Sequence, residues 1–424
     1  MYPEVSNLDE VLSNIDTANT SHTIASFFFL DSCPNIIELR KTLTEVSERF
    51  PRLRSIQKKT VKGLSWSEVP DFSVDEQLLF IKDESLKNTD DIASAASEVF
   101  TKGLQLNRPL WKVVVLAGSG ANAILFLLHH SMTDGVGGQE MIETFFSKKK
   151  DGPAQIFNTR KLSKIESGKQ SADAFELSVK SSWKQWLGEC FNAPQKCCLT
   201  GSNTSKRVIN VSYIFKSSIQ QIKREAGSSL NDVLLSLVAG GVKRYLNHKG
   251  EKVPSVRAIM PVSLRGPSER YTLGNRLSGA GVDLPINIED PQNRLRFISE
   301  QVSKLKKSGA LGAYYLLGTF IAKFPKSVQR FLSEYHAKKT TFIVTNVPGP
   351  HDYRFVAGAR VKSFHGIPAL MKGHGIGLGF MAYKQTIGVS VVSDPNIVKD
   401  PNFLLACIEE ELREFETIYL RKAA

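Results

Sequence analysis

The chain has 424 residues, of which 42% are hydrophobic and 23% are charged, and this length allows two domains with separate cores. Its longest apolar runs hold about ten residues, too few to cross a bilayer. The N-terminus lacks the basic and apolar regions of a signal peptide, so we expect a cytoplasmic protein.

The net charge of +13 favours anionic partners. No aromatic and basic recognition motif is present, so we do not expect nucleic acid to be a partner. The possible partners are anionic lipid surfaces and phosphorylated cofactors such as coenzyme A. The alternative is a basic surface that has no specific partner and only aids solubility. The cysteines have no paired metal-binding spacing, so we expect reduced thiols and no metal; they are Cys33, Cys190, Cys197, Cys198 and Cys407.

Helix-like and strand-like segments alternate over residues 1–145. Residues 35–53 have apolar side chains at helical spacing, and the pattern predicts a helix that stops at Pro51. Residues 110–118 and 121–130 are strand-like and only two residues apart, which predicts a hairpin. The second of these is apolar on both faces and is therefore expected to be a central, buried strand. A helix over residues 138–149 is expected after a glycine-rich turn.

Residues 146–205 are polar and are predicted to be a crossover linker with one amphipathic helix around residues 174–191. A second α/β segment follows over residues 206–424. Its expected strands cover residues 207–215, 256–264, 340–350, 373–383 and 386–394, and its expected helices residues 218–226, 229–246, 291–309 and 402–420. The fold class is therefore α/β (α+β), with an N-terminal half of residues 1–145, the linker, and a C-terminal half.

Two adjacent histidines end the central strand in "LLHHSMTDG", residues 127–135. Successive side chains on a strand point to opposite faces, so His129 and His130 are not expected to share a metal ion. A histidine held at the end of a buried strand suits a general base, because a neutral imidazole accepts a proton near neutral pH. The alternative is that the two histidines only pack in the core and take no part in catalysis. Asp134 is expected to be buried and to lock the following turn through an arginine.

The motif "HHSMTDG" resembles the HHxxxDG signature of the coenzyme A-dependent acyltransferase superfamily, which includes chloramphenicol acetyltransferases and condensation domains. From about residue 6 to the C-terminus the chain resembles the bacterial wax ester synthase/diacylglycerol acyltransferase family. The matching segments, in order, are "RPLWKVVVL", "SLNDVLLSLVAGGVKRYL", "IMPVSLR", "LGNRLSGAGVDLPINIEDPQNRL", "VTNVPGP" and "AGARV". The chain departs from the family in its short crossover and in Gly377, where an asparagine is frequent.

The resemblance implies two chloramphenicol-acetyltransferase-like halves that form a pseudo-dimer with a central tunnel. It implies an O-acyltransferase that moves a long-chain acyl group from acyl-CoA to a fatty alcohol or diacylglycerol, making wax esters or triacylglycerol. His130 is then the general base, His129 supports it, and Asp134 with Gly135 shapes the turn. No metal and no permanently bound cofactor are implied. The alternatives are a condensation-type or short-chain alcohol O-acyltransferase, and a non-catalytic relative.

Several residues of the family segments have two interpretations. Pro109, Leu110 and Trp111 either line the alcohol channel or belong to the core. Asn231 and Asp232 either bind substrate or only cap a helix. Asn275 either donates to the oxyanion or forms a turn. The alternate glycines at 373, 375, 377 and 379 either admit an acyl chain or a packed helix. Arg265 is the arginine expected to pair with Asp134.

Residues 310–339 are expected to form two helices divided at Pro325. The first is apolar and aromatic, and the second alternates cations with apolar residues. Such helices either pack on the protein's own sheet or lie in a membrane interface. We expect peripheral association with an anionic membrane or a lipid droplet, through Lys323, Lys326 and Arg330.

Overall fold

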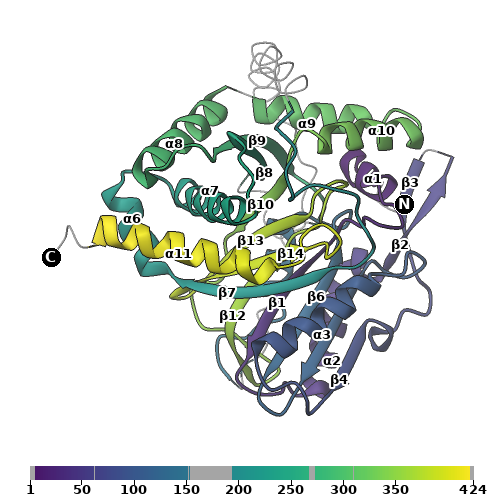
Figure 1. The fold of residues 1–424 in the computed structure, drawn as a ribbon. Helices are drawn as coiled ribbons and strands as arrows, with labels where there is room; N and C mark the ends of the chain where they lie inside the picture. Colours follow the sequence, from purple (N-terminus) through teal and green to yellow (C-terminus); the bar gives the residue numbers. More distant parts are fainter. Residues whose placement is uncertain are drawn as a thin grey trace.

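The computed structural model describes residues 5–61, 63–150, 152, 193–266, 273–308 and 310–420. The described residues form two six-stranded sheets with helices packed on them, and a two-stranded hairpin of β2 (Ser55–Thr60) and β3 (Gly63–Glu68) (Figure 1). The fold class is mixed α/β, as predicted. The helix expected around residues 174–191 lies outside the described residues.

The first sheet carries the histidine motif at the end of a central strand. Its strand order is β11 (Phe355–Val356), β12 (Ala359–Ile367), β1 (Thr23–Leu30), β6 (Asn122–His129), β5 (Trp111–Ala117) and β4 (Leu78–Lys82). The predicted hairpin of β5 and β6 is confirmed, and β6 is central because β1 and β5 pair with its two edges. The sheet is buried on both faces, by α2 (Ile36–Arg49) on one and α3 (Thr89–Lys102) on the other. Asn35 caps α2, which ends before Pro51 as predicted.

Strands β11 and β12 come from the C-terminal part of the chain but complete the first sheet. β12 pairs antiparallel with β1, so that Phe28 lies opposite Phe364. Without β12, β1 would leave a row of unpaired backbone groups at the sheet edge. A division of the chain at residues 145 and 206 therefore does not separate the two sheets.

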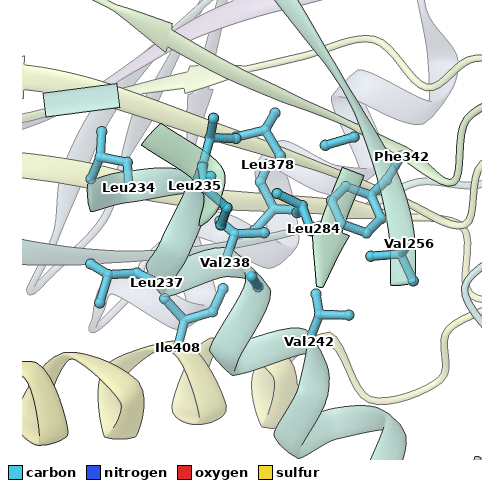
Figure 2. Close-up of a cluster of buried hydrophobic side chains, with 14 of the residues drawn as sticks. Leu234, Leu235, Leu237, Val238, Val242, Val256, Leu284, Phe342, Leu378 and Ile408 are labelled. Atoms are coloured by element: carbon cyan, nitrogen blue, oxygen red, sulfur yellow. The ribbon is translucent and has the colours of Figure 1, made fainter. Parts of the chain in front are cut away.

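The second sheet has the order β7 (Val208–Phe215), β14 (Thr386–Ser393), β13 (Ile376–Tyr383), β10 (Phe342–Val347), β8 (Ser255–Ser263) and β9 (Leu277–Pro285). α7 (Leu230–His248) packs between this sheet and α11 (Pro401–Leu420), with α6 (Lys216–Glu225) and α8 (Pro291–Lys307) beside it (Figure 1). In Figure 2 the side chains of Leu235, Val238 and Val242 lie beside Val256, Leu284, Phe342 and Leu378, and Leu237 lies beside Ile408. This dry core holds the second sheet in place.

Three of the four alternate glycines near β13 lie against other segments of the chain, which leave no space there for an acyl chain or a helix. A Cβ atom at Gly379 would collide with the carbonyl oxygen of Gly366 in β12. A Cβ at Gly377 would press on Ile343, Leu370 and Pro368, and one at Gly375 on Ile397. At Gly375, Gly377 and Gly379 both sequence-based interpretations are therefore wrong, because these glycines allow β12 and the neighbouring loops to approach the second sheet closely. Gly373 has no neighbour within 4 Å of a Cβ position, and its φ of 90° suits glycine.

Helices α9 (Ala310–Ile321) and α10 (Lys326–Ala337) follow one another along one end of the molecule, and both contact α1 (Asn7–Asn14) (Figure 1). The predicted break at Pro325 is confirmed, since this residue directly precedes α10. Within the described part of the chain, no helix combines the length and apolar character needed to cross a bilayer.

Candidate active site

His130 directly follows β6, and its ring is held by Asn275 from the other half of the chain. The His130 Nδ1 and Asn275 Oδ1 atoms are 2.9 Å apart. The Asn275 side-chain nitrogen donates to Asp9 Oδ1 at 2.7 Å and to the His130 carbonyl at 2.6 Å. Because both acceptors lie beside the Asn275 side-chain nitrogen, the Asn275 Oδ1 atom must face the imidazole, where it accepts the Nδ1–H of His130. The proton therefore sits on Nδ1, and Nε2 keeps a lone pair with no hydrogen-bond partner among the described residues.

Burial lowers the pKa of His130 below its ordinary value of 6.5, although the nearby Asp134 carboxylate opposes this shift. His22 adds to the lowering. The imidazole is therefore neutral at pH 7, the form in which a histidine accepts a proton. Tautomer and protonation state together prepare Nε2 to act as a base.

The lowered pKa of His130 predicts the acidic limb of the pH–rate profile. A base works only while it is unprotonated, so the midpoint of the acidic limb of acyl transfer should lie below pH 6.5, the ordinary pKa of histidine. The measurement is kcat/KM from acidic to neutral pH, with circular dichroism at each pH to exclude unfolding. An acidic limb centred at or above 6.5 in folded protein would contradict the prediction.

His129 is fully buried and points into a different set of polar groups. The Ser131 backbone N–H donates to its Nδ1 at 3.2 Å, so its Nε2–H donates to Asp16 Oδ2 at 2.9 Å. Asp16 also accepts from His22 Nδ1 at 2.7 Å. Burial opposes ionisation of Asp16, but the hydrogen bonds from the two histidines outweigh it and hold the pKa of Asp16 well below its usual value. Both ring nitrogens of His129 are thus engaged in a buried structural network.

Asp134 is nearly fully buried and joins the two halves of the chain. Arg265 Nε lies 3.0 Å from both of its carboxylate oxygens, so the expected ion pair is present. The backbone N–H of Arg276 donates to Oδ2 at 2.8 Å, and that of Gly137 donates to Oδ1 at 2.8 Å. Asp134 therefore fixes the motif to the segment before β9 that carries Asn275.

The segment after Asp134 is helical and is not a turn. α4 (Gly135–Glu143) begins three residues earlier than the sequence predicted, because Asp134 is its N-cap. The expected helix over residues 138–149 is therefore wrong at both ends. The glycine at position 135 is needed for close packing, since a Cβ there would lie 3.1 Å from Val347 Cγ2 in β10.

Asp9 and Arg52 complete the site, and sequence reasoning missed both. Asp9 in α1 is fully buried, and it accepts from the Asn275 backbone N–H at 3.1 Å as well as from the side chain. Burial raises the pKa of Asp9, while the Arg52 charge opposes that shift. Arg52 donates to the Met132 carbonyl at 2.8 Å and stacks over Trp66. No spacing in the sequence connects these positions.

Asn275 does not have the role of an oxyanion donor that the sequence left open. Both of its side-chain hydrogens are taken, by Asp9 and by the His130 carbonyl. Gly274 before it has a φ of 107°, a backbone conformation that suits glycine and agrees with the expected turn. Asn275 instead orients His130.

The remaining family residues lie outside this hydrogen-bonded network. Pro109 and Leu110 are buried, and the buried Trp111 donates to the Leu53 carbonyl at 2.7 Å and stacks on Phe126, which fits the core interpretation. Asp232 closes a capping box with Ser229, and Asn231 accepts from Asn346 at 2.6 Å. Their roles toward substrate stay predictions. Among the described residues, no group of three or more His, Cys, Asp or Glu is arranged to hold a metal ion.

Two sheets joined by an exchanged strand, with HHxxxDG at their junction, form a fold that solved wax ester synthase and condensation-domain structures share. The fold is similar to that of a starter condensation domain of rhizomide synthetase in complex with C8-CoA, with a TM-score of 0.65, 16% identity and coverage of 99% of this chain and 95% of that chain. It is also similar to the wax ester synthase/diacylglycerol acyltransferase from Marinobacter aquaeolei VT8, with a TM-score of 0.71, 14% identity and coverage of 98% and 100%.

Residues 5–180 match the wax ester synthase/diacylglycerol acyltransferase catalytic domain, and residues 273–416 match the WS/DGAT C-terminal domain. The chain belongs to the wax ester synthase/diacylglycerol acyltransferase family and is an O-acyltransferase. It is 22% identical over 393 residues to O-acyltransferase WSD of Acinetobacter baylyi, covering 85% of each chain. It is 22% identical over 380 residues to a "probable" diacylglycerol O-acyltransferase of Mycobacterium tuberculosis H37Rv, covering 84% of this chain and 82% of that one.

Proposed function

We propose that the protein transfers a long-chain acyl group from acyl-CoA to the hydroxyl of a fatty alcohol or diacylglycerol, with His130 as the general base. The observation that carries this proposal is the hydrogen bond from His130 Nδ1 to Asn275, which leaves Nε2 unprotonated. Membership of the family supports the long-chain ester product.

In the proposed reaction, His130 Nε2 removes the proton from the acceptor hydroxyl as the oxygen attacks the thioester carbonyl carbon. The tetrahedral oxyanion then collapses, the carbon–sulfur bond breaks, and the imidazolium returns its proton to the leaving coenzyme A thiolate. Asn275 Oδ1, held by the rest of its amide, stabilises the imidazolium through Nδ1–H. No covalent acyl-enzyme is needed.

Product analysis tests the proposal. Purified protein is incubated with palmitoyl-CoA and, separately, hexadecanol, diacylglycerol and short alcohols, and products are separated by thin-layer chromatography. Wax ester or triacylglycerol is the expected product. Transfer only to short alcohols would favour the short-chain alternative, and no ester from any acceptor would contradict the proposal.

We infer that the enzyme works at the cytoplasmic surface of an anionic membrane or lipid droplet, through α9 and α10. α9 is highly apolar, yet its buried residues are only Ala310 and Gly312. Large apolar side chains are exposed along the two helices and their connection, and exposed lysines accompany them: Leu316, Phe320, Phe324, Phe331, Tyr335, Lys323, Lys326 and Lys338. This mixture is typical of a helix in a membrane interface.

Arg330 does not belong to this exposed set. Its guanidinium donates to the backbone carbonyls of Asn14 and Asp16, at 2.9 and 2.8 Å. The expectation that Arg330 faces the membrane is therefore wrong, because α10 uses it to hold the loop that carries Asp16.

Charge reversal at Lys323 and Lys326 is expected to weaken vesicle binding. Each cation near an anionic surface adds ~1 kcal/mol, so replacing both with Glu should lower binding at least about tenfold. The measurement is co-sedimentation with anionic and neutral vesicles at low and high salt. The matched control replaces the exposed Lys41 and Lys102, on α2 and α3, with Glu. Equal binding of all three proteins, or no binding to anionic vesicles, would contradict the inference.

A further inference from the structure

Asp9 is a fully buried carboxylate to which the reaction sequence above gives no task. It is the third residue of α1, whose N-cap is Ser6. An acidic side chain at this position often turns back to the backbone of the N-cap residue. The Asp9 side chain instead binds both the backbone and the side chain of Asn275, 266 residues away. Its contacts therefore belong to the active site as well as to the helix.

One of these two hydrogen bonds fixes the direction of the other. The Asn275 backbone N–H donates to Asp9 Oδ1 at 3.1 Å, and a backbone N–H can only donate. Asp9 Oδ1 is therefore an acceptor, so the Asn275 side chain must present its nitrogen to it, at 2.7 Å. The amide oxygen is then turned toward His130, 2.9 Å from Nδ1. The Asp9 carboxylate thus selects the orientation of the amide.

The orientation of this amide sets the tautomer of His130. An oxygen that faces Nδ1 accepts a hydrogen bond only from a protonated Nδ1, which leaves the lone pair on Nε2. The opposite orientation would place an NH2 group against Nδ1, move the proton to Nε2 and leave no base for the acceptor hydroxyl. The His130 carbonyl, 2.6 Å from the amide nitrogen, favours the same orientation as Asp9. Of these two acceptors, Asp9 is the one that can carry a charge.

Arg52 holds the Asp9 carboxylate against the histidine motif. Its Nη1 atom lies 3.5 Å from Asp9 Oδ2 and donates to the Met132 carbonyl at 2.8 Å. Burial raises the pKa of Asp9, and the charge of Arg52 and the hydrogen bonds from Asn275 oppose this shift. An ionised Asp9 polarises the Asn275 amide, so its Oδ1 becomes a stronger acceptor for the imidazolium that forms during the reaction.

We propose that Asp9 is a positioning residue for acyl transfer, whose carboxylate orients the Asn275 amide and thereby keeps the proton of the neutral His130 ring on Nδ1. This inference rests on the proposed function, in which His130 Nε2 is the general base. A carboxylate, an amide and an imidazole then act in series, and each comes from a distant part of the chain.

The decisive variant is Asp9→Leu, which fills a similar volume but accepts no hydrogen bond. Histidine tautomers are read by ¹⁵N NMR of histidine-labelled protein at neutral pH, with the His130 signals identified by their absence from His130→Ala. The wild type should show a protonated Nδ1, and Asp9→Leu should show protonated Nε2. Because two donors of Asn275 lose their acceptor, kcat should fall at least about tenfold while KM changes less than about twofold. An unchanged tautomer in folded Asp9→Leu would overturn the proposal.

Two further variants separate positioning from a loss of stability. Asp394→Leu removes another fully buried carboxylate, which pairs with Arg207 at 3.3 Å and makes no contact with Asn275. It should lower the melting temperature but leave the His130 tautomer unchanged and kcat within about twofold of wild type. Asp9→Asn keeps an acceptor oxygen and should lose less of kcat than Asp9→Leu. Equal kcat losses in the two leucine variants, or in the two Asp9 variants, would contradict the proposal. If Asp9→Leu does not fold, Asp9→Ala removes the same acceptor without added bulk.

The tautomer measurement needs no turnover, so it separates failure of this inference from failure of the proposed function. A tautomer change in Asp9→Leu that is absent from Asp394→Leu supports the inference even if product analysis finds no long-chain ester. A wild-type His130 that carries its proton on Nε2 would contradict the proposed function as well, because no base would then face the acceptor hydroxyl.

Discussion

Replacing His130 with Ala is expected to lower acyl transfer by about 10²–10⁴-fold, the usual contribution of a positioned general base. His130 is half-buried and makes one side-chain hydrogen bond, to Asn275, so the fold should survive its loss. The measurement is kcat/KM with palmitoyl-CoA and the best acceptor, together with circular dichroism and thermal melting.

His129→Ala is the matched control for this prediction. It removes the neighbouring imidazole, which is fully buried and bonded to Asp16 and Ser131. We expect a larger loss of stability and a smaller loss of rate, since this ring has no free nitrogen to accept a substrate proton. His130→Ala activity within about tenfold of wild type would show that another group removes the proton.

Asp134→Asn is expected to destabilise the protein by ~3–5 kcal/mol, because it leaves the buried charge of Arg265 uncompensated. Asp134 and Arg265 side chains are only 3% and 5% exposed, so water screens their attraction little. The rate should fall as well, since Asp134 connects the His130 motif to the backbone of Arg276, the residue after Asn275. Urea denaturation and kcat/KM measure the two effects.

The control is Asp75→Asn, which breaks the ion pair with Arg40 on the surface, where the side chains are 63% and 48% exposed. An exposed pair of this kind contributes less than ~1 kcal/mol. If Asp134→Asn lost activity but unfolded at the same urea concentration as wild type, Asp134 would have a direct chemical role and not the structural one argued above.

These two predictions concern one junction, built from residues of both halves. Asn275, Arg265 and Arg276 come from the second half and contact the motif of the first. The exchanged β12 holds the two sheets against each other at Gly366 and Gly379. The base is therefore oriented only when both halves are in place, and a separated N-terminal half is not expected to contain an ordered site.

The sequence by itself determined the features that depend on near neighbours along the chain. Apolar runs and helical spacing predicted β6 and α2, and Pro325 predicted the break between α9 and α10, since these patterns act within a few residues. The strand β9 was not predicted, because Gly279 and Gly281 interrupt its alternation of apolar residues. The HHxxxDG motif identified the catalytic histidine candidate, because its residues also lie within a few positions of one another along the chain.

Only the tertiary structure decided what surrounds that histidine. Asn275 is 145 residues from His130 and 266 from Asp9, and Asp16 is 113 residues from His129. Such contacts depend on how the sheets pack and on the crossing of β12 into the first sheet, and no local pattern specifies them. A buried polar group needs hydrogen-bond partners, and in a folded chain these partners can come from any part of the sequence. Such distant partners therefore decide the tautomer of His130, the structural role of His129 and the pairing of Asn275.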